Sequence, residues 1–407
     1  MHVIGIVAEY NPFHKGHEYL ISKARELVGD PRAVVMSIMS GPFTQRGLPA
    51  IAPKHVRAKQ ALKCGSDVVI ELPFEWACAP ANEFAYGAVY SLLATGVVTD
   101  IAFGIDAGTP EVIRSLSDPA LYESDDYKTA LKACLADGMS FPSANAAAIS
   151  GILGPSVLEV LHSPNSILAV EYLKAMRTLG ANFKVHMIPR IGQGYRDTDQ
   201  EEDTILSASS VRSAIGRSIS VAAIADAVNG KLPDKSSAVL LSSLSGGAYH
   251  LADLDAYAVR AVTSGPASSD IRFMGDGLDG YINNVTSELR SSEMSFEEMS
   301  SKLATKHFTM PRIYRALTMM MLGVKSSDIS GSPEYIRVLG FGHEGRYCLK
   351  IMGKCAKLPI IHNMSDFLSY PDIAGSMELS VRAEDLAGIF MGIPPHSCWD
   401  VPPVIVK

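Results

Sequence analysis

The strongest constraint on the fold is an alternation of apolar runs and amphipathic stretches over the first 190 residues. Helical patterns occupy about 15–28, 54–64, 81–95, 125–136 and 165–179. Between them stand five runs that are almost continuously apolar, as strands covered on both faces should be: HVIGIVA (2–8), AVVMSIM (33–39), DVVIELP (67–73), DIAFG (100–104) and FKVHMIP (183–189). Strands that alternate with helices at roughly 30-residue spacing form βαβ units, which predicts a mostly parallel sheet in a three-layer α/β sandwich.

The second half of the chain has a different pattern. After about residue 220 the strand signal fades, and stretches such as VAAIADAVNGKL and RIYRALTMMMLG carry helical spacing between clusters of Ser, Gly, Asp and Pro. A chain of 407 residues also exceeds the size at which one hydrophobic core usually stops growing. We therefore expect two domains, with a mainly helical one over 221–407.

Composition excludes several classes of protein. With 47% hydrophobic and 19% charged residues the chain is globular rather than disordered. The N-terminus lacks a secretory signal, and no stretch of about 18 uncharged apolar residues follows. The cysteines form no CxxC pair, which favours scattered thiols in a reducing cytoplasm over disulfides or a structural metal: Cys64, Cys78, Cys134, Cys348, Cys355 and Cys398.

Charge is distributed unevenly along the chain. The net charge is −7, yet residues 302–357 hold ten Lys or Arg against three acids. That segment is +7 and the remainder −14, so a local phosphate-binding face is possible in an acidic protein. A solvated basic helix surface is the alternative interpretation.

The segment EYNPFHKGH (9–17) stands where the first strand must turn into a helix. In an open parallel sheet, ligands bind beyond the carboxyl ends of the strands. Pro12 fixes a turn, and Gly16 removes a side chain where a phosphate must approach the backbone. His14 and His17, three residues apart, would project from one side of the first helical turn, where unpaired N–H groups favour an anion. Incidental surface histidines and a metal site are the alternatives; for a metal site the motif offers no third histidine, and Glu9 is the one carboxylate left open as a ligand.

A second segment, LSASSVRSAI (206–215), is typical of a Ser-capped helix with a basic residue one turn in. Ser207, Ser209 and Ser210 are the candidate caps, and Arg212 can reach phosphate. Alone, this is only a capped helix.

Together these segments carry a resemblance to known families. HxGH in a strand-turn-helix setting resembles the signature of nucleotidylyltransferases, and SASSVRSAI resembles their ISSTxxR-type motif, although SASS replaces the threonine-bearing form. The chain as a whole resembles the bacterial tRNA(Met) cytidine acetate ligase family, most strongly over 1–215 and in patches beyond. The matching segments are GIVAEYNPFHKGH, MSGPFTQRGLPAI, CGSDVVIELPF, FAYGAV, AFGID, SPNSILAVEYLKAM, IPRIGQGYRD, SASSVRSAI and YIRVLGF.

The resemblance implies a fold and an activity. The fold would be a Rossmann-like, HUP-type ATP-binding catalytic domain over 1–220, followed by a mainly α-helical, tRNA-binding domain over 221–407. ATP and acetate would form acetyl-adenylate with release of pyrophosphate. The acetyl group would then pass to N4 of the wobble cytidine of elongator tRNA(Met), giving N4-acetylcytidine.

The resemblance also implies site residues, with His14 and His17 as the catalytic pair. The expected ATP-binding residues, including Ser209 and Arg212 from the second motif, are Val7, Ala8, Glu9, Tyr10, Asn11, Pro12, Phe13, His14, Lys15, Gly16, His17, Glu18, Tyr19, Leu20, Gly104, Asn165, Arg190, Ile191, Ser209 and Arg212.

Several of these residues have a physical interpretation of their own. Gly104 ends a strand where a side chain would block adenosine, or is only a turn glycine. Asn165 follows a proline at a helix start, so it could contact ribose or serve as N-cap. Arg190 follows a strand and would pair with phosphate, unless it is a surface arginine. Gln45 and Arg46 also follow a strand and are expected on the acetate or cytidine side.

The chemistry fits this inventory. Acetate is ionised at neutral pH, so no general base is needed to make the first nucleophile, and Mg²⁺ is expected with the phosphates. The basic segment would hold the tRNA backbone, with Arg312, Arg315, Arg337 and Arg346 as contacts. Two alternatives remain: an adenylyltransferase acting on a small phosphorylated metabolite, and a non-catalytic, ATP-responsive RNA-binding adaptor.

Overall fold

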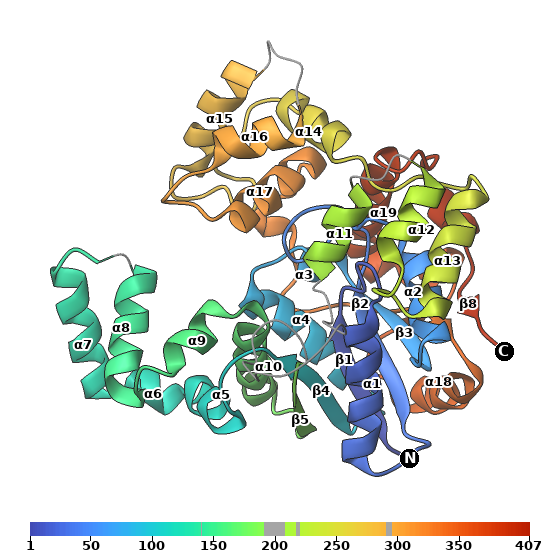
Figure 1. The fold of residues 1–407 in the computed structure, drawn as a ribbon, viewed down its shortest axis with the longest axis horizontal. Helices are drawn as coiled ribbons and strands as arrows, with labels where there is room; N and C mark the ends of the chain where they lie inside the picture. Colours follow the sequence, from blue (N-terminus) through green and yellow to red (C-terminus); the bar gives the residue numbers. More distant parts are fainter. Residues whose placement is uncertain (140, 191–207, 217–219, 290–294) are drawn as a thin grey trace.

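A single mixed sheet forms the centre of the molecule (Figure 1). The computed structural model describes residues 1–139, 141–190, 208–216, 220–289 and 295–407. Within them the sheet has eight strands in the order β5-β4-β1-β2-β3-β6-β7, with β8 paired to β6. The strands are β1 (Val3–Ala8), β2 (Val34–Ser40), β3 (Val68–Leu72), β4 (Asp100–Ile105), β5 (Lys184–Pro189), β6 (Ile336–Phe341), β7 (Ile360–Ile361) and β8 (Val404–Ile405).

The five strands predicted from the apolar runs are confirmed, and they are parallel to one another. Successive residues of these strands contribute to opposite faces of the sheet. Val34 belongs to the core on one face and Val35 to the core on the other, and both are almost fully buried. Burial on both faces explains why the runs are continuously apolar rather than alternating.

Helices cover both faces, as the three-layer prediction requires. On one face lie α1 (Lys15–Val28) and α2 (Lys54–Lys63), and on the other α4 (Ala81–Ala94), α10 (Pro164–Leu179) and α18 (His343–Cys355). The first strand is followed along the chain by neighbours on one side, β2 and β3, before the chain crosses to β4 on the other side. The sheet therefore has its topological switch point between β1 and β4, where parallel α/β sheets bind ligands.

The expected division at residue 220 does not separate a sheet domain from a helical one. The strands β6, β7 and β8 all come from the second half, and β6 pairs antiparallel with β3 at the sheet's far side. Extended pairing between distant segments outweighs the helical character of the surrounding sequence. The second half thus completes the central sheet as well as adding helices.

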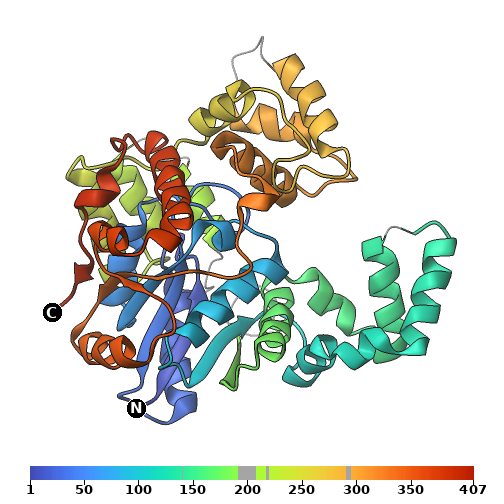
Figure 2. The same cartoon turned by 180° about the vertical axis from the view of Figure 1, so that it is seen from behind.

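Helices away from the sheet form two further groups, seen from opposite sides in Figures 1 and 2. One group, α5 to α9, projects beside β4. The other, α14 to α17, lies above the carboxyl ends of the strands. The remaining bounds are α3 (Phe74–Ala77), α5 (Pro110–Ser117), α6 (Pro119–Glu123), α7 (Asp125–Ala136), α8 (Phe141–Leu153), α9 (Val157–His162), α11 (Ala208–Gly216), α12 (Val221–Val228), α13 (Asp234–Ser245), α14 (Leu254–Thr263), α15 (Leu278–Leu289), α16 (Phe296–Leu303), α17 (Met310–Leu322), α19 (Ala374–Ile389), and the 3₁₀ turns Ser326–Asp328, Met364–Ser369, Pro371–Ile373 and Ser397–Asp400.

A second hydrophobic core is formed by the helices α11 through α17, by α19 and by the segments that follow β2 and β3. It contains Phe43 from the loop after β2, Phe74 of α3 and Met319 of α17, all fully buried. The helices above the sheet are therefore packed directly on the segments that emerge from its carboxyl edge. Among the helices of the described ranges, none is both long enough and apolar enough to cross a lipid bilayer.

Candidate nucleotide-binding site

His14 and His17 lie together at the start of α1, directly beyond β1. His14 is the N-cap, and its Nδ1 accepts a hydrogen bond from the N–H of Gly16 at 3.0 Å. Nδ1 of His17 accepts one from the backbone N–H of His14 at 3.1 Å, which completes a reciprocal capping box. The two rings stack with their centroids 3.8 Å apart. The expectation that both rings project from one side of the first turn is therefore confirmed.

These bonds determine which nitrogen of each ring carries the proton. A nitrogen that accepts an N–H bond has no proton of its own, so each neutral ring carries its proton on Nε2 and presents it as a donor. Burial lowers the pKa of His14 to about 3, and the nearby Arg190 and Arg212 add to that shift. Burial, with His14 and Arg190, also lowers the pKa of His17 well below its usual value. At neutral pH the pair thus offers two uncharged N–H donors.

Aromatic side chains support the histidine pair from below. Tyr10 and Phe13 are fully buried, and their ring centroids lie 4.9 and 5.4 Å from that of His17. The Tyr10 hydroxyl bonds Ser37 of β2 at 2.7 Å. The motif predicted both residues as part of the ATP-binding segment, but their side chains are closed to a ligand. Any contact they make with a nucleotide must come from the backbone.

Polar contacts fix the loop between β1 and α1. A carboxylate oxygen of Glu9 accepts from the N–H of Gln45 at 2.9 Å, and Oδ1 of Asn11 accepts from the N–H of Ile51 at 2.8 Å. The fully buried Arg57 of α2 donates to the carbonyls of Glu9, Ser40, Gly41 and Ala52. Arg57 therefore ties the carboxyl ends of β1 and β2 together. Sequence reasoning missed it, because nothing distinguishes it from the other basic residues of its helix.

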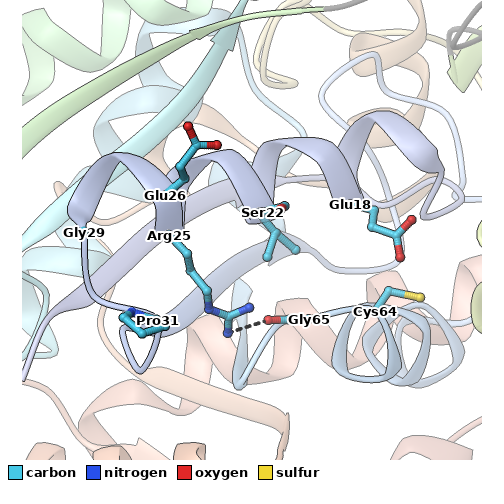
Figure 3. A pocket seen from close by; sticks show the side chains of 9 residues that line it. Glu18, Ser22, Arg25, Glu26, Gly29, Pro31, Cys64 and Gly65 are labelled. Atoms are coloured by element: carbon cyan, nitrogen blue, oxygen red, sulfur yellow. Dashed lines mark hydrogen bonds between the residues drawn. The ribbon is translucent and has the colours of Figure 1, made fainter.

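The other residues of the predicted segment lie at the end of β1, in the loop after it and in the first half of α1. Val7, Ala8, Lys15, Gly16, Tyr19 and Leu20 are half-buried, while Pro12 is buried. Glu18 is different, because it faces a separate depression of about 470 Å³ between α1 and the turn before β3. Figure 3 shows its carboxylate pointing toward Cys64, and Arg25 farther along α1 donating to the carbonyl of Gly65. The side chain of Glu18 thus lines a depression other than the histidine site, and its assignment to the nucleotide site stays a prediction.

The carboxyl end of β4 brings three predicted residues around an acid that was not predicted. Asp106 accepts from the side-chain amide of Asn165 at 2.6 Å and from Ser163, and forms an ion pair with Arg190 at 3.3 Å. A Cβ on Gly104 would lie only 3.0 Å from the Arg190 stem, so the missing side chain makes room for that arginine. The signal for Asp106 was present in the sequence: it is a carboxylate two residues after Gly104, at the same strand end.

Asn165 does not cap α10. Ser163 is the N-cap, since its hydroxyl accepts from the N–H of Ser166, and Pro164 occupies the first helical position. The amide of Asn165 is thereby left to contact Asp106. Ile191, the expected neighbour of Arg190, lies outside the described residues.

The second motif reaches the first through Arg212. Its guanidinium donates to the carbonyl of Asn11 at 2.9 Å, and it lies close enough to Glu9 and Arg46 for their charges to influence its pKa, which burial lowers. Ser209 belongs to the first turn of α11, whereas Ser207 lies outside the described residues. The structure thus brings Arg190 and Arg212, both far from His14 in sequence, to the helix end at which His14 lies.

Gln45 and Arg46 lie in the loop after β2, beside this helix end. Gln45 connects two parts of the molecule, because its N–H binds Glu9 and its carbonyl accepts from Arg315 of α17 at 3.0 Å. Arg46 is exposed and close to Arg212. Their position next to the histidines is compatible with the predicted substrate side.

The four arginines predicted to contact tRNA do not form one face. Arg337 lies in β6, is only 2% exposed, and faces Glu71 and Glu384, so its assignment to RNA is wrong. Arg315 is occupied by the Gln45 carbonyl. Arg312 pairs with Asp276 at 2.8 Å, above the carboxyl edge of the sheet. Arg346 is exposed on α18, which begins at the opposite edge. The sequence segment was basic as a whole, but β6 passes through the interior and divides it.

Comparison with known proteins agrees with the geometry. A family model described as HIGH nucleotidyl transferase matches residues 1–394. The tRNA(Met) cytidine acetate ligase of Acetivibrio thermocellus is 33% identical over 399 residues, covering 95% of this chain and 94% of that protein. The protein of the same name from a Clostridium perfringens strain is 32% identical, with all of both chains covered.

Two crystal structures of Thermotoga maritima TmcAL are similar along the entire length of both chains. The apo form has a TM-score of 0.86 at 31% identity, and the form bound with alpha-thio ATP has a TM-score of 0.83 at 30% identity. The resemblance inferred from the sequence motifs is confirmed. This chain belongs to the HIGH nucleotidyl transferases and, within them, to the family of the tRNA(Met) cytidine acetate ligases.

Proposed function

We propose that this chain is an ATP-dependent ligase that acetylates N4 of the wobble cytidine of elongator tRNA(Met) in two steps, through acetyl-adenylate. The observation that carries the proposal is the stacked, neutral histidine pair at the start of α1, at the switch point of the sheet and beside Arg190 and Arg212. The names of the relatives and the nucleotide analogue in the Thermotoga maritima structure support it.

In the first step the carboxylate of acetate attacks the α-phosphorus of ATP and pyrophosphate leaves. The Nε2–H groups of His14 and His17 are in position to donate to phosphate oxygens as charge moves onto them. The α1 N-terminus adds the positive end of the helix dipole, and the two guanidinium groups neutralise the triphosphate. The site binds and orients the reactants and stabilises charge, so it needs no protein nucleophile.

Magnesium is expected to accompany the nucleotide. Within the described ranges no three His, Cys, Asp or Glu side chains are placed to bind one metal ion, and Asp106 is already engaged by Arg190 and Asn165. The residues present therefore fit an ion whose ligands come largely from the phosphates. When bound, Mg²⁺ would neutralise part of the triphosphate charge.

In the second step N4 of the cytidine attacks the acetyl carbon, and AMP leaves the same site. An anticodon base is already unpaired from a second strand, so it can enter the crevice without melting a duplex. Gln45 and Arg46 stand on the side from which such a base and acetate could approach. We place Arg312 among the tRNA contacts, because it lies above the carboxyl edge and its side chain is still 31% exposed when it pairs with Asp276.

We further propose that the protein acts in the cytoplasm, where its tRNA partner is made. The five cysteines whose side chains the structure describes are free thiols, which supports a reducing compartment.

Measurement of pyrophosphate release with and without acetate and methionine tRNA tests the proposal. Acetate-dependent release, together with transfer of labelled acetate into tRNA, is the expected result. Release that requires a phosphorylated metabolite in place of acetate would favour the adenylyltransferase. Nucleotide binding without pyrophosphate release from any acceptor would favour the adaptor.

A further inference from the structure

Five of the ten cations of the basic segment 302–357 have polar partners within the described part of the protein. Arg337 is buried beside Glu71 and Glu384, and Arg315 donates to a backbone carbonyl. Lys302, Arg312 and Lys325 each pair with a carboxylate of their own neighbourhood. Four of these five cations are therefore balanced by carboxylates.

Helix α18 and the residue just after it hold four of the other five cations, and Lys306, before α17, is the fifth. One side of it packs on the sheet, and that side consists of Gly345, Cys348 and Met352, all buried. At about 100° per residue, the cations Arg346, Lys350 and Lys354 fall within an arc of roughly 80° opposite the buried side. All three are exposed, and so is Lys357, two residues beyond the end of the helix.

These four residues form no ion pair within the described ranges, although the Arg346 guanidinium lies 6.0 Å from the Phe341 ring. Tyr347 borders the row and is 61% exposed, which is unusual for a large aromatic side chain. The one acid of the helix, Glu344, lies outside the arc. We define the α18 basic face as Arg346, Lys350, Lys354 and Lys357 together with Tyr347.

We propose that the α18 basic face binds the acceptor RNA at a second place, away from the reactive crevice, with its cations on the phosphate backbone and an unpaired base stacked on Tyr347. The inference rests on the proposed function, because the acceptor RNA is the ligand. Successive cations of the row rise by about 6 Å along the helix, so they can meet successive phosphates of one strand rather than a single anion.

The combination of residues favours RNA over other polyanions. An anionic membrane or an acidic protein would be attracted by the cations alone, whereas an exposed aromatic ring beside cations is the platform on which an unpaired base stacks. The face is also flanked by polar residues rather than by the exposed apolar residues that enter a bilayer: His343 is 90% and Glu344 62% exposed in their side chains.

The position of α18 determines how long an RNA must be to contact both the crevice and the α18 basic face. Its first turn lies beside Asp67, which precedes β3, so the face begins at the amino edge of the sheet, opposite the histidines. Figure 1 shows α18 near the N-terminus of the chain and far from α11 and α17. A six-residue strand spans about 20 Å, so an RNA with one base in the crevice must extend along the protein by more than this to reach the face. A stem-containing RNA such as a tRNA is long enough, whereas an isolated anticodon trinucleotide is not.

The test compares the salt dependence of tRNA binding between the intact protein and a variant with the four cations changed to Ala. Removal of one phosphate contact should reduce the slope of log K against log salt by about 0.7 to 0.9. The fourfold variant is therefore expected to have a slope lower by about 3, with weaker binding at low salt. Tyr347→Ala should weaken binding about tenfold, and Tyr347→Phe should restore it.

A matched variant removes the same charge from scattered exposed positions. It carries Lys59→Ala, Lys63→Ala, Lys132→Ala and Lys184→Ala. It should change the slope by less than one, because net charge alone contributes little to contacts at a specific place. Melting temperatures report whether each variant is folded.

The proposal is overturned if the fourfold α18 variant keeps the slope of the intact protein, or if the scattered variant loses as much. Unchanged tRNA binding together with weakened binding to phosphatidylserine vesicles would instead assign the face to a membrane. Acetate-dependent pyrophosphate release by the intact protein is measured in parallel. Its absence would refute the proposed function whatever the RNA measurements show.

Discussion

His14 carries out two tasks through the two nitrogens of one ring, and a pair of substitutions can separate them. Nδ1 caps α1 by accepting the N–H of Gly16 at 3.0 Å, while the proton on Nε2 is the donor proposed for phosphate. Asparagine is among the best N-cap residues, so His14→Asn should keep the cap. Its amide is too short to place a donor where Nε2 lies. Alanine keeps neither function.

The expected magnitudes follow from these contacts. Loss of an N-cap costs about 1 kcal/mol of stability. His14 is only 2% exposed, so His14→Ala also leaves a cavity, and the total should be about 2 kcal/mol or more. Loss of one preorganised donor to developing charge slows a reaction by about 10²- to 10³-fold. His14→Ala should therefore lose both stability and rate, whereas His14→Asn should lose rate while keeping most of its stability.

Urea unfolding and acetate-dependent exchange of pyrophosphate into ATP measure the two quantities separately. Exchange by His14→Asn within tenfold of the unsubstituted protein would refute the assignment of the Nε2 donor. Equal stabilities of the Ala and Asn variants would refute the capping role. A uniform loss of both quantities in both variants would mean that the ring acts only through packing.

Three further predictions concern stability. Burial holds the pKa of His14 at about 3, below the unfolded value of 6.5, so between these values the folded protein binds fewer protons than the unfolded chain. The contribution of this ring to stability is therefore fully present above pH 6.5 and is lost as pH decreases toward 3. This ring alone should cost about 2 kcal/mol at pH 5 relative to pH 7.5 in urea unfolding, and His14→Asn should lack that loss. Gly47→Ala should destabilise the protein by about 3 kcal/mol, since φ is +88° and a Cβ would lie 2.3 Å from the α17 backbone. The control Gly29→Ala, with open space around the added Cβ, should cost only about 1 kcal/mol. Equal losses of stability in the two variants would contradict this prediction. Lys54→Met should cost about 3–5 kcal/mol, because it leaves the buried Glu71 carboxylate without the ammonium 2.9 Å away, and a shift in the urea midpoint worth less than about 1 kcal/mol would contradict it.

The parts of the fold that the sequence predicted are those set by local chemistry. Strands buried on both faces leave continuous apolar runs, so β1 to β5 were found within a residue or two. The start of α1 near Lys15 was also predictable, because Pro12 fixes a turn shortly before it. The histidine pair followed from the same local rule, since residues three apart share a helix side.

The parts that were missed depend on pairing between distant segments. YIRVLGF contains the apolar and β-branched residues of a strand, but nothing local indicates that it pairs with β3 or that Arg337 would lie inside the molecule. Arg57 and Asp106 were missed for the same reason, because each binds groups from segments far apart in the sequence. Their chemistry is visible in the sequence, but their partners are not.

The crevice divides donation and charge between different residue types. The stacked rings of His14 and His17 stay neutral, because burial, with Arg190 nearby, lowers the pKa of both. They therefore contribute direction without charge, while Arg190 and Arg212 contribute charge that guanidinium groups retain at any physiological pH. An ATP molecule meets a fixed positive field and two fixed donors. Since neither depends on a group that titrates near pH 7 in the free protein, the affinity for the triphosphate should vary little between about pH 7.5 and 8.5, where the terminal phosphate of ATP is also fully ionised. A steep change in nucleotide affinity over that range would show that a proton is taken up on binding. The positive charge that holds the triphosphate would then be assigned to protonated histidines as well as to the arginines.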